Sequence, residues 1–110
     1  MNSNDWFERA KNLLPGGVNS PVRAFKHVDR NPVYFENAEG PYLFDVEKNR
    51  YVDFCLAFGP LILGHSPKCV VEAVETQVKK GSTYGACHPL EVQLAEDLLR
   101  AYPFFQKARL

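Results

Sequence analysis

Apolar side chains in the first segment recur at helical spacing, at Trp6, Phe7, Ala10, Leu13 and Leu14. The acidic Asp5 precedes them, and Pro15-Gly16-Gly17 interrupts the pattern. The segment therefore predicts a short amphipathic helix that stops at Pro15. From Pro15 to Pro32 the chain has no clear period and many prolines and glycines, which predicts a long loop. Long loops in compact domains are more often functional than accidental.

The middle of the chain holds three runs rich in β-branched and aromatic residues: Val33 to Ala38, Tyr42 to Val46 and Tyr51 to Phe54. The turn residues Glu39-Gly40-Pro41 and the polar stretch 47–50 separate them. This arrangement predicts a meander of antiparallel strands. The apolar, glycine-flanked stretch from Cys55 to His65 follows, and we expect it to be tucked between packed elements.

Two further helices are predicted in the last third of the chain. Ser66 can cap the first, which has Pro67 in its first turn, Gly81 as its stop and an inward stripe of Val70, Val71, Val74 and Val78. The second runs from Pro89 to about Ala101 and ends before Pro103, with Val92, Leu94, Ala95, Leu98 and Leu99 inward. The predicted fold class is α+β: an N-terminal helix, a three-stranded antiparallel meander and two helices.

Composition narrows the range of functions. A chain of 110 residues is the size of one small domain, and it is 45% hydrophobic and 24% charged, as globular proteins are. Because 13 basic residues balance 13 acidic ones, no broad positive field would attract nucleic acid or a membrane. There is no apolar run long enough to cross a bilayer and no signal-peptide pattern. Cys55, Cys69 and Cys87 form no disulfide framework, so we expect a cytoplasmic location.

Arg23 is the first candidate binding residue. It lies in a proline-bounded segment three residues after Ser20, which adds a second hydrogen-bonding group. A guanidinium on such a loop can grip a carboxylate with two parallel hydrogen bonds. A solvated loop arginine is the commoner reading of the same spacing.

Phe58 and His65 flank the second irregular stretch. Phe58, before Gly59-Pro60, can form a flat wall against a planar ligand, although ordinary core packing is the commoner role of such a residue. His65 could ligate a metal or move protons, but a structural hydrogen bond is the commoner role. Cys87 and His88 are adjacent, a poor arrangement for a nucleophile and its base. No set of residues has the spacing of a metal site, so none is predicted.

A longer match adds to these separate signals. The run from Leu14 to Lys26, LPGGVNSPVRAFK, resembles the N-terminal signature of the glutamate-1-semialdehyde aminomutases, a family within the class III aminotransferases. The resemblance continues through residues 38–46, 49–53, 59–65, 70–74 and 81–86, and thus covers nearly the whole chain. Phe58 differs from the tryptophan usual in that family, and Cys87-His88-Pro89 also departs from the family pattern.

The resemblance implies the small-domain part of a fold-type I pyridoxal-phosphate enzyme, a homodimer that makes 5-aminolevulinate for tetrapyrrole synthesis. It also implies that Ser20 and Arg23 hold the substrate carboxylate and that Phe58 lines the pocket. The substrate is a small amino-aldehyde or amino acid, with no nucleic acid or membrane as partner.

The phosphate-binding loop and the Schiff-base lysine of that family have no counterpart in residues 1–110. Lys68, Lys79, Lys80 and Lys107 do not fit that role, so residues 1–110 are expected to be an N-terminal segment that is inactive alone, with no catalytic or cofactor-binding residue of its own. Two alternatives stay open: a class III aminotransferase with another amino acceptor, and a non-catalytic fragment that binds another chain through exposed apolar faces.

Overall fold

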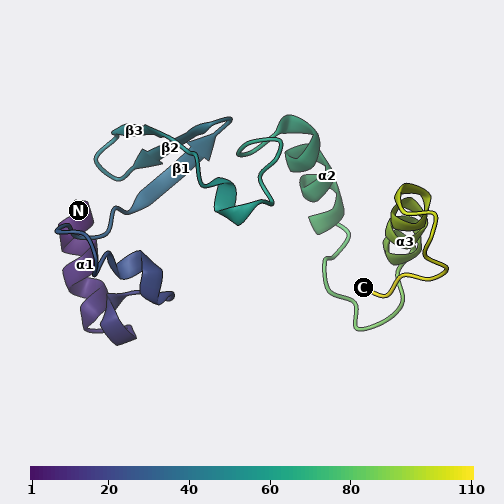
Figure 1. Cartoon of the computed structure of the whole chain (residues 1–110), viewed down its shortest axis with the longest axis horizontal. Coiled ribbons are helices and arrows are strands. Elements are labelled where there is room, and N and C mark those ends of the chain that lie inside the picture. Colours follow the sequence, from purple (N-terminus) through teal and green to yellow (C-terminus); the bar gives the residue numbers. More distant parts are fainter. The chain divides into compact units, whose positions relative to one another are not determined.

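The computed structural model describes all 110 residues, which divide into two compact units, Met1–Val71 and Glu72–Leu110. Three helices and a three-stranded antiparallel sheet confirm the predicted α+β class (Figure 1). The elements are α1 (Ser3–Lys11), η1 (Pro15–Gly17), η2 (Pro21–Ala24), β1 (Phe35–Glu39), β2 (Tyr42–Asp45), β3 (Arg50–Val52), η3 (Leu56–Phe58), α2 (Lys68–Val78) and α3 (Pro89–Ala101), where η marks a short 3-10 turn.

Helix α1 begins at a capping box. The Asn2 side chain accepts a hydrogen bond from the Asp5 N–H at 2.9 Å, and the Asp5 carboxylate accepts one from the Asn2 N–H at 2.9 Å. The predicted helix is confirmed, but its predicted end at Pro15 is wrong, because α1 stops at Lys11. Leu13 and Leu14 continue the apolar period in sequence while both of their N–H groups converge on the Ala10 carbonyl in the turn that ends the helix.

The sheet is the predicted meander, with β2 between β1 and β3 (Figure 1). In the β1–β2 pair Glu39 lies opposite Tyr42, and a shift of register between Phe35 and Asn37 marks a bulge. In the β2–β3 pair Tyr42 lies opposite Val52. Each strand is one residue shorter than the β-rich run that predicted it, and β1 ends one residue later and β3 begins one residue earlier than its run.

The turn from β2 to β3 is organised by one buried carboxylate. Asp45 is 2% exposed, and its Oδ1 accepts hydrogen bonds from the N–H groups of Glu47 at 3.0 Å and Asn49 at 2.7 Å. Its Oδ2 accepts from Asn49 Nδ2 and from the Tyr51 hydroxyl, both at 2.9 Å. Burial acts to raise the pKa of Asp45, but these hydrogen bonds outweigh it and lower the pKa. The polar stretch 47–50 is therefore a closed network and not merely a spacer.

Helices α2 and α3 confirm the predicted elements, but the predicted burial of their apolar stripes is largely wrong. Val70, Val71, Val74 and Val78 of α2 are 39 to 58% exposed. In α3, Ala95, Leu98 and Leu99 are half-buried, while Val92 and Leu94 are exposed. Helical periodicity reports that one face is apolar, whereas burial also needs an element that covers this face.

Ser66 does not cap α2. Its hydroxyl donates to the Ala38 carbonyl at 3.3 Å, its φ is +50°, and the helix starts two residues later at Lys68. Pro67 accordingly precedes the first turn of the helix, and its carbonyl accepts the N–H groups of Val70 and Val71. The Ser66 side chain, which was expected to cap a helix, therefore binds a carbonyl of strand β1 instead.

Candidate functional site

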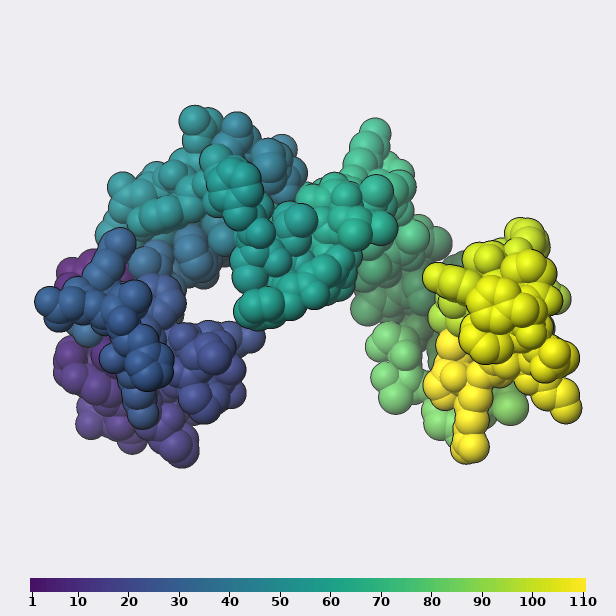
Figure 2. Space-filling model, viewed as in Figure 1, coloured from purple at the N-terminus to yellow at the C-terminus, as the bar shows by residue number.

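The proline-glycine loop is fixed at its base by α1. The ring of Phe7 packs onto Gly17, which is buried and has a φ of +75°. A Cβ at this position would lie 2.7 Å from Phe7 Cε2, so only glycine allows the ring to approach the backbone this closely. The space-filling view shows the loop at the surface beside the purple atoms of α1 (Figure 2). The second glycine thus sets where the loop leaves the helix.

Ser20 and Arg23 lie on the same 3-10 turn. Ser20 precedes η2 in an extended conformation, and its carbonyl accepts the Arg23 N–H at 2.9 Å. The next residue, Ala24, is buried and anchors the turn. The Arg23 guanidinium is exposed and has no ion pair, so its fork of N–H donors is open to a planar anion.

Phe58 stands on a turn with an unusual backbone. Leu56, Ala57 and Phe58 have φ values of +49°, +50° and +65°. Left-handed geometry costs roughly 1–2 kcal/mol for each non-glycine residue, so three in succession must be held by other contacts. The Phe58 side chain is 88% exposed, and the prediction that Cys55–His65 is tucked between packed elements is wrong for this chain. The explanation of Phe58 as a core residue fails with it.

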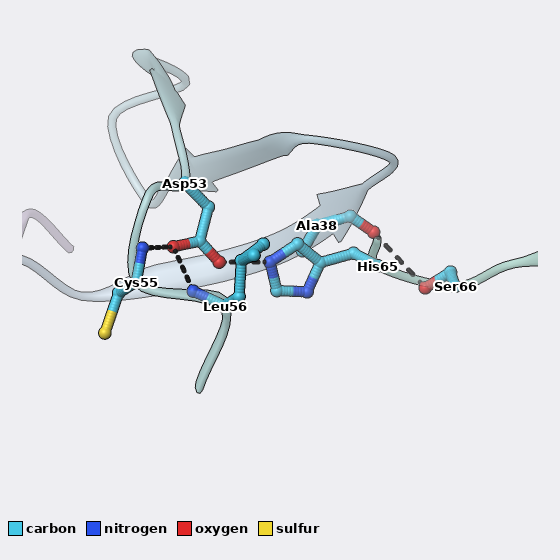
Figure 3. Close-up of polar contacts among 6 residues, drawn as sticks. All are labelled: Ala38, Asp53, Cys55, Leu56, His65 and Ser66. Carbon is cyan, nitrogen blue, oxygen red and sulfur yellow. Dashed lines mark hydrogen bonds and ion pairs between the residues drawn. The ribbon is translucent and has the colours of Figure 1, made fainter. Parts of the chain in front are cut away.

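Asp53 and His65 close this loop at its two ends (Figure 3). Asp53 Oδ1 accepts the N–H groups of Cys55 at 2.8 Å and Leu56 at 3.0 Å, while Oδ2 lies 2.7 Å from His65 Nε2. The two side chains are 5% and 15% exposed. The prediction that His65 makes a structural hydrogen bond is confirmed. A carboxylate can only accept, so His65 Nε2–H is the donor.

The charge state of Asp53 follows from these contacts. The hydrogen bond from His65 lowers the pKa of Asp53, and the N–H groups of Leu56 and Cys55 lower it further, against a smaller opposing effect of burial. Asp53 is therefore ionised at neutral pH. Its carboxylate is a fixed negative charge on which one side chain and two backbone groups converge.

A backbone bridge reinforces the closure. The His65 N–H donates to the Gly40 carbonyl at 2.8 Å, and the Gly40 N–H donates to the His65 carbonyl at 3.0 Å. Gly64 lies against this bridge with a φ of +76°, and a Cβ there would come within 2.8 Å of the Gly40 oxygen. The end of the loop is thereby attached to the turn between β1 and β2.

The predicted site residues form two groups. Ser20 and Arg23 share the η2 turn, and no hydrogen bond or ring contact in the structure joins them to Phe58. Sequence reasoning missed Asp53. The available signal was an aspartate directly after a strand, followed by a loop that ends in Gly64-His65.

Cys87 and His88 do not form a nucleophile and base. His88 Nδ1 accepts the Leu90 N–H at 3.2 Å and caps α3, and its ring stacks on Tyr84 with centroids 4.8 Å apart. The hydroxyl of Tyr84 donates to the carbonyl oxygens of Lys80 and Gly81, at 2.9 Å each, beyond the end of α2. The stacked rings of Tyr84 and His88 thus hydrogen-bond backbone groups after the end of α2 and at the start of α3.

The residues present do not fit a complete site for pyridoxal phosphate. Lys11 pairs with Glu8 and Lys48 with Glu36, both at the surface. Lys68 belongs to the first turn of α2, and Lys79 and Lys80 follow its end. No group of three potential metal ligands occurs, and no helix is long and apolar enough to span a membrane.

Comparison with known proteins assigns the family. The family model described as aminotransferase class III matches residues 24–108. Glutamate-1-semialdehyde 2,1-aminomutase of Heliobacterium modesticaldum is 50% identical over 108 residues, which are 98% of this chain and 25% of the relative. The enzyme of the same name from Thermosipho melanesiensis is 46% identical over 104 residues, 94% of this chain and 25% of the relative. The chain spans about a quarter of the length of these curated relatives.

Solved structures agree on the fold. An omega-transaminase from Sphaerobacter thermophilus superposes with a TM-score of 0.85 and 30% identity, over 96% of this chain and 23% of the transaminase. A glutamate-1-semialdehyde aminomutase from Pseudomonas aeruginosa superposes with a TM-score of 0.81 over 92% of this chain and 22% of its own, and at 21% identity it supports the fold alone. Sequence and fold together place the chain: it belongs to the class III aminotransferases.

Proposed function

We propose that residues 1–110 are the substrate-carboxylate-binding portion of a pyridoxal-phosphate aminomutase that converts glutamate-1-semialdehyde to 5-aminolevulinate, the precursor of tetrapyrroles. Relatives of that name at 44 to 50% identity support the reaction. A cytoplasmic homodimer is the form we expect for the whole enzyme. Residues 1–110 alone are expected to be inactive, since the remaining three quarters of the relatives' length lies outside them.

The observation that carries this proposal is the free guanidinium of Arg23. The turn η2 holds Arg23 and Ser20 together, and Pro21 limits its backbone so that little freedom is lost on binding. Glutamate-1-semialdehyde has one carboxylate, which Arg23 would bind with two parallel N–H···O bonds and Ser20 with its hydroxyl. Phe58 would offer its exposed ring as a wall of the pocket.

Pyridoxal phosphate, when bound, supplies the electron sink for transfer of the amino group. The attachment lysine and the phosphate cradle would come from sequence beyond residues 1–110. The contribution of this chain is orientation: a carboxylate fixed by Arg23 places the reacting end of the substrate at a defined distance from the cofactor.

The test uses a full-length enzyme that carries residues 1–110, obtained from a complete reading frame or by joining this chain to the remaining three quarters of the Heliobacterium modesticaldum relative. We call this protein the carrier enzyme. Arg23→Ala should raise KM for glutamate-1-semialdehyde by about 10- to 100-fold, the loss expected for a charge-assisted hydrogen-bonded pair. Arg23→Lys should recover only part of this, because lysine cannot bind two oxygens in a fork.

Arg30→Ala is the matched control, since Arg30 is another exposed arginine of the same loop. It should leave KM unchanged. An unchanged KM and kcat in Arg23→Ala, with cofactor bound normally, would disprove the carboxylate-binding role.

A second candidate is transfer of the amino group to a separate keto acid. The superposition on an omega-transaminase at 30% identity favours it. Turnover of the carrier enzyme on glutamate-1-semialdehyde alone, compared with turnover on an amino donor plus a keto acid, separates the two reactions.

A further inference from the structure

We propose that Asp53 and His65 are positioning residues that act through Phe58: the hydrogen bond between their side chains fixes the turn 56–59 and so sets the place of the Phe58 ring. The value of this for catalysis rests on the proposed function, in which Phe58 is a wall of the substrate pocket. The placement of the ring itself does not depend on which substrate is bound.

Asp53 is anchored to the sheet through its backbone. Its N–H donates to the Pro41 carbonyl at 2.8 Å, so the residue continues the edge of the sheet just beyond β3. From this fixed point its carboxylate reaches forward to the N–H groups of Cys55 and Leu56. One oxygen therefore sets the direction in which the chain leaves the sheet.

The chain returns to Asp53 at the end of the loop. His65 comes twelve residues after Asp53, yet its ring pairs with the other carboxylate oxygen (Figure 3). Its backbone is also bridged to Gly40. Both ends of the 54–64 segment thus meet at one side chain. A closed loop has far fewer conformations than one held at a single end.

The turn inside the loop is held by polar contacts and not by side-chain packing. Gly59 also has a positive φ, +128°, and its N–H donates to the Leu56 carbonyl at 3.0 Å. Phe54, Phe58 and Ile62 are 84 to 91% exposed, so packing of these side chains does not hold the turn. The polar contacts of Asp53 are what select this conformation, and strained turns of this kind gather at ligand sites.

The experiment places a fluorinated phenylalanine at position 58 alone in the carrier enzyme with its cofactor bound. Fluorine NMR should show a shifted or broadened resonance in Asp53→Ala and His65→Ala. Asp53→Asn, which keeps an acceptor for the N–H groups and loses the charge, should give a smaller change. Tyr51→Phe is the control, because it removes one hydrogen bond from the Asp45 network at the other end of the β2–β3 ladder. An unchanged resonance in both alanine variants would overturn the proposal.

Kinetics supply the second arm. Asp53→Ala should raise KM for glutamate-1-semialdehyde about 10-fold, because the Phe58 ring would be displaced from its place in the pocket wall. In a Phe58→Ala background the same substitution should change KM by less than about two-fold, because residues that act in series are not additive. Equal effects in both backgrounds would mean that Asp53 acts on stability and not through Phe58, and would refute the proposal.

The two proposals can fail separately. If the carrier enzyme does not turn over glutamate-1-semialdehyde while the fluorine resonance responds as expected, the proposed reaction is wrong and the positioning role stands. If Arg23→Ala impairs binding while the resonance stays fixed in every variant, the positioning role is wrong and the proposed function stands.

Discussion

Asp45 and Asp53 lie at opposite ends of the β2–β3 ladder and are bound in parallel ways. Each uses its Oδ1 to accept two backbone N–H groups from residues that closely follow it, Glu47 and Asn49 in one case, Cys55 and Leu56 in the other. Each also has a lowered pKa. The difference is in the partner of Oδ2: Asp45 binds Asn49 and Tyr51, within six residues, whereas Asp53 binds His65, twelve residues away.

That difference separates a network that builds a hairpin from one that places a loop. All partners of Asp45 belong to the turn and strand it organises, so the cluster closes on itself. Asp53 instead links the sheet to a segment whose large side chains are exposed and whose backbone is left-handed at three residues. The Asp45 network thus stabilises the hairpin, and the Asp53 network fixes where the following loop leaves and returns to the sheet.

Among the substitutions that separate the two networks, Gly64→Ala in the carrier enzyme is expected to have the largest effect on kcat/KM. A Cβ at Gly64 would lie 2.8 Å from the Gly40 oxygen, so the bridge between Gly40 and His65 must open and the Asp53–His65 pair must shift with it. We expect kcat/KM to fall by about 100-fold, the loss associated with a displacement of about 1 Å in a binding site. Steady-state kinetics with glutamate-1-semialdehyde measure this loss.

Gly40→Ala is the control for that substitution. Gly40 lies in the same bridge and also has a positive φ, +51°, but the space where its Cβ would be built is open. It should therefore show only the backbone penalty of about 1 kcal/mol in stability and a much smaller change in kcat/KM. Similar losses in the two variants would show that strain, and not the steric contact at Gly64, governs the loop.

Acid should weaken both clusters. Folding lowers the pKa of both carboxyl groups. Each ionised carboxylate therefore contributes its full stabilisation at pH values above the unfolded-state pKa of about 3.9. This contribution is lost as the pH falls below that value and through the lower pKa of the folded state. Thermal midpoints of the carrier enzyme from about pH 6 to about pH 3 should therefore decline more steeply in the wild type than in Asp45→Asn or Asp53→Asn. Only Asp53→Asn should also shift the fluorine resonance at position 58. A slope unchanged by either substitution would contradict the assigned hydrogen bonds.

The sequence predicted the parts of the molecule that depend on neighbours along the chain. The bounds of α3 were correct because Pro89 and Pro103 mark both of its ends, and the meander followed from β-rich runs between turn residues. The proline-bounded loop containing Ser20 and Arg23 was expected for the same reason. The end of α1 was misplaced because Leu13 continues the apolar period beyond the last helical residue.

The missed features depend on residues far apart in sequence. Pairing of Asp53 with His65 leaves no periodic signal, and Ser66 looks like a helix cap until the Ala38 carbonyl is placed beside it. The sequence pattern also does not predict that the valine face of α2 is exposed, since the apolar positions are the same whether or not another element covers them.

Substitution of Tyr51 is expected to have the smallest effect on kcat/KM, and it tests whether the Asp45 and Asp53 networks are independent. The hydrogen bond to Asp45 raises the pKa of the Tyr51 phenol, with desolvation as a further cause. In Asp45→Asn, ultraviolet titration of the carrier enzyme should show the pKa of the Tyr51 phenol returning toward its ordinary value. Tyr51→Phe should change kcat/KM by less than about two-fold, because it leaves the Asp53 contacts intact. Asp53→Asn should not move the phenol titration. If it does, Asp45 and Asp53 belong to one coupled network along β3, and the division between hairpin and loop does not hold.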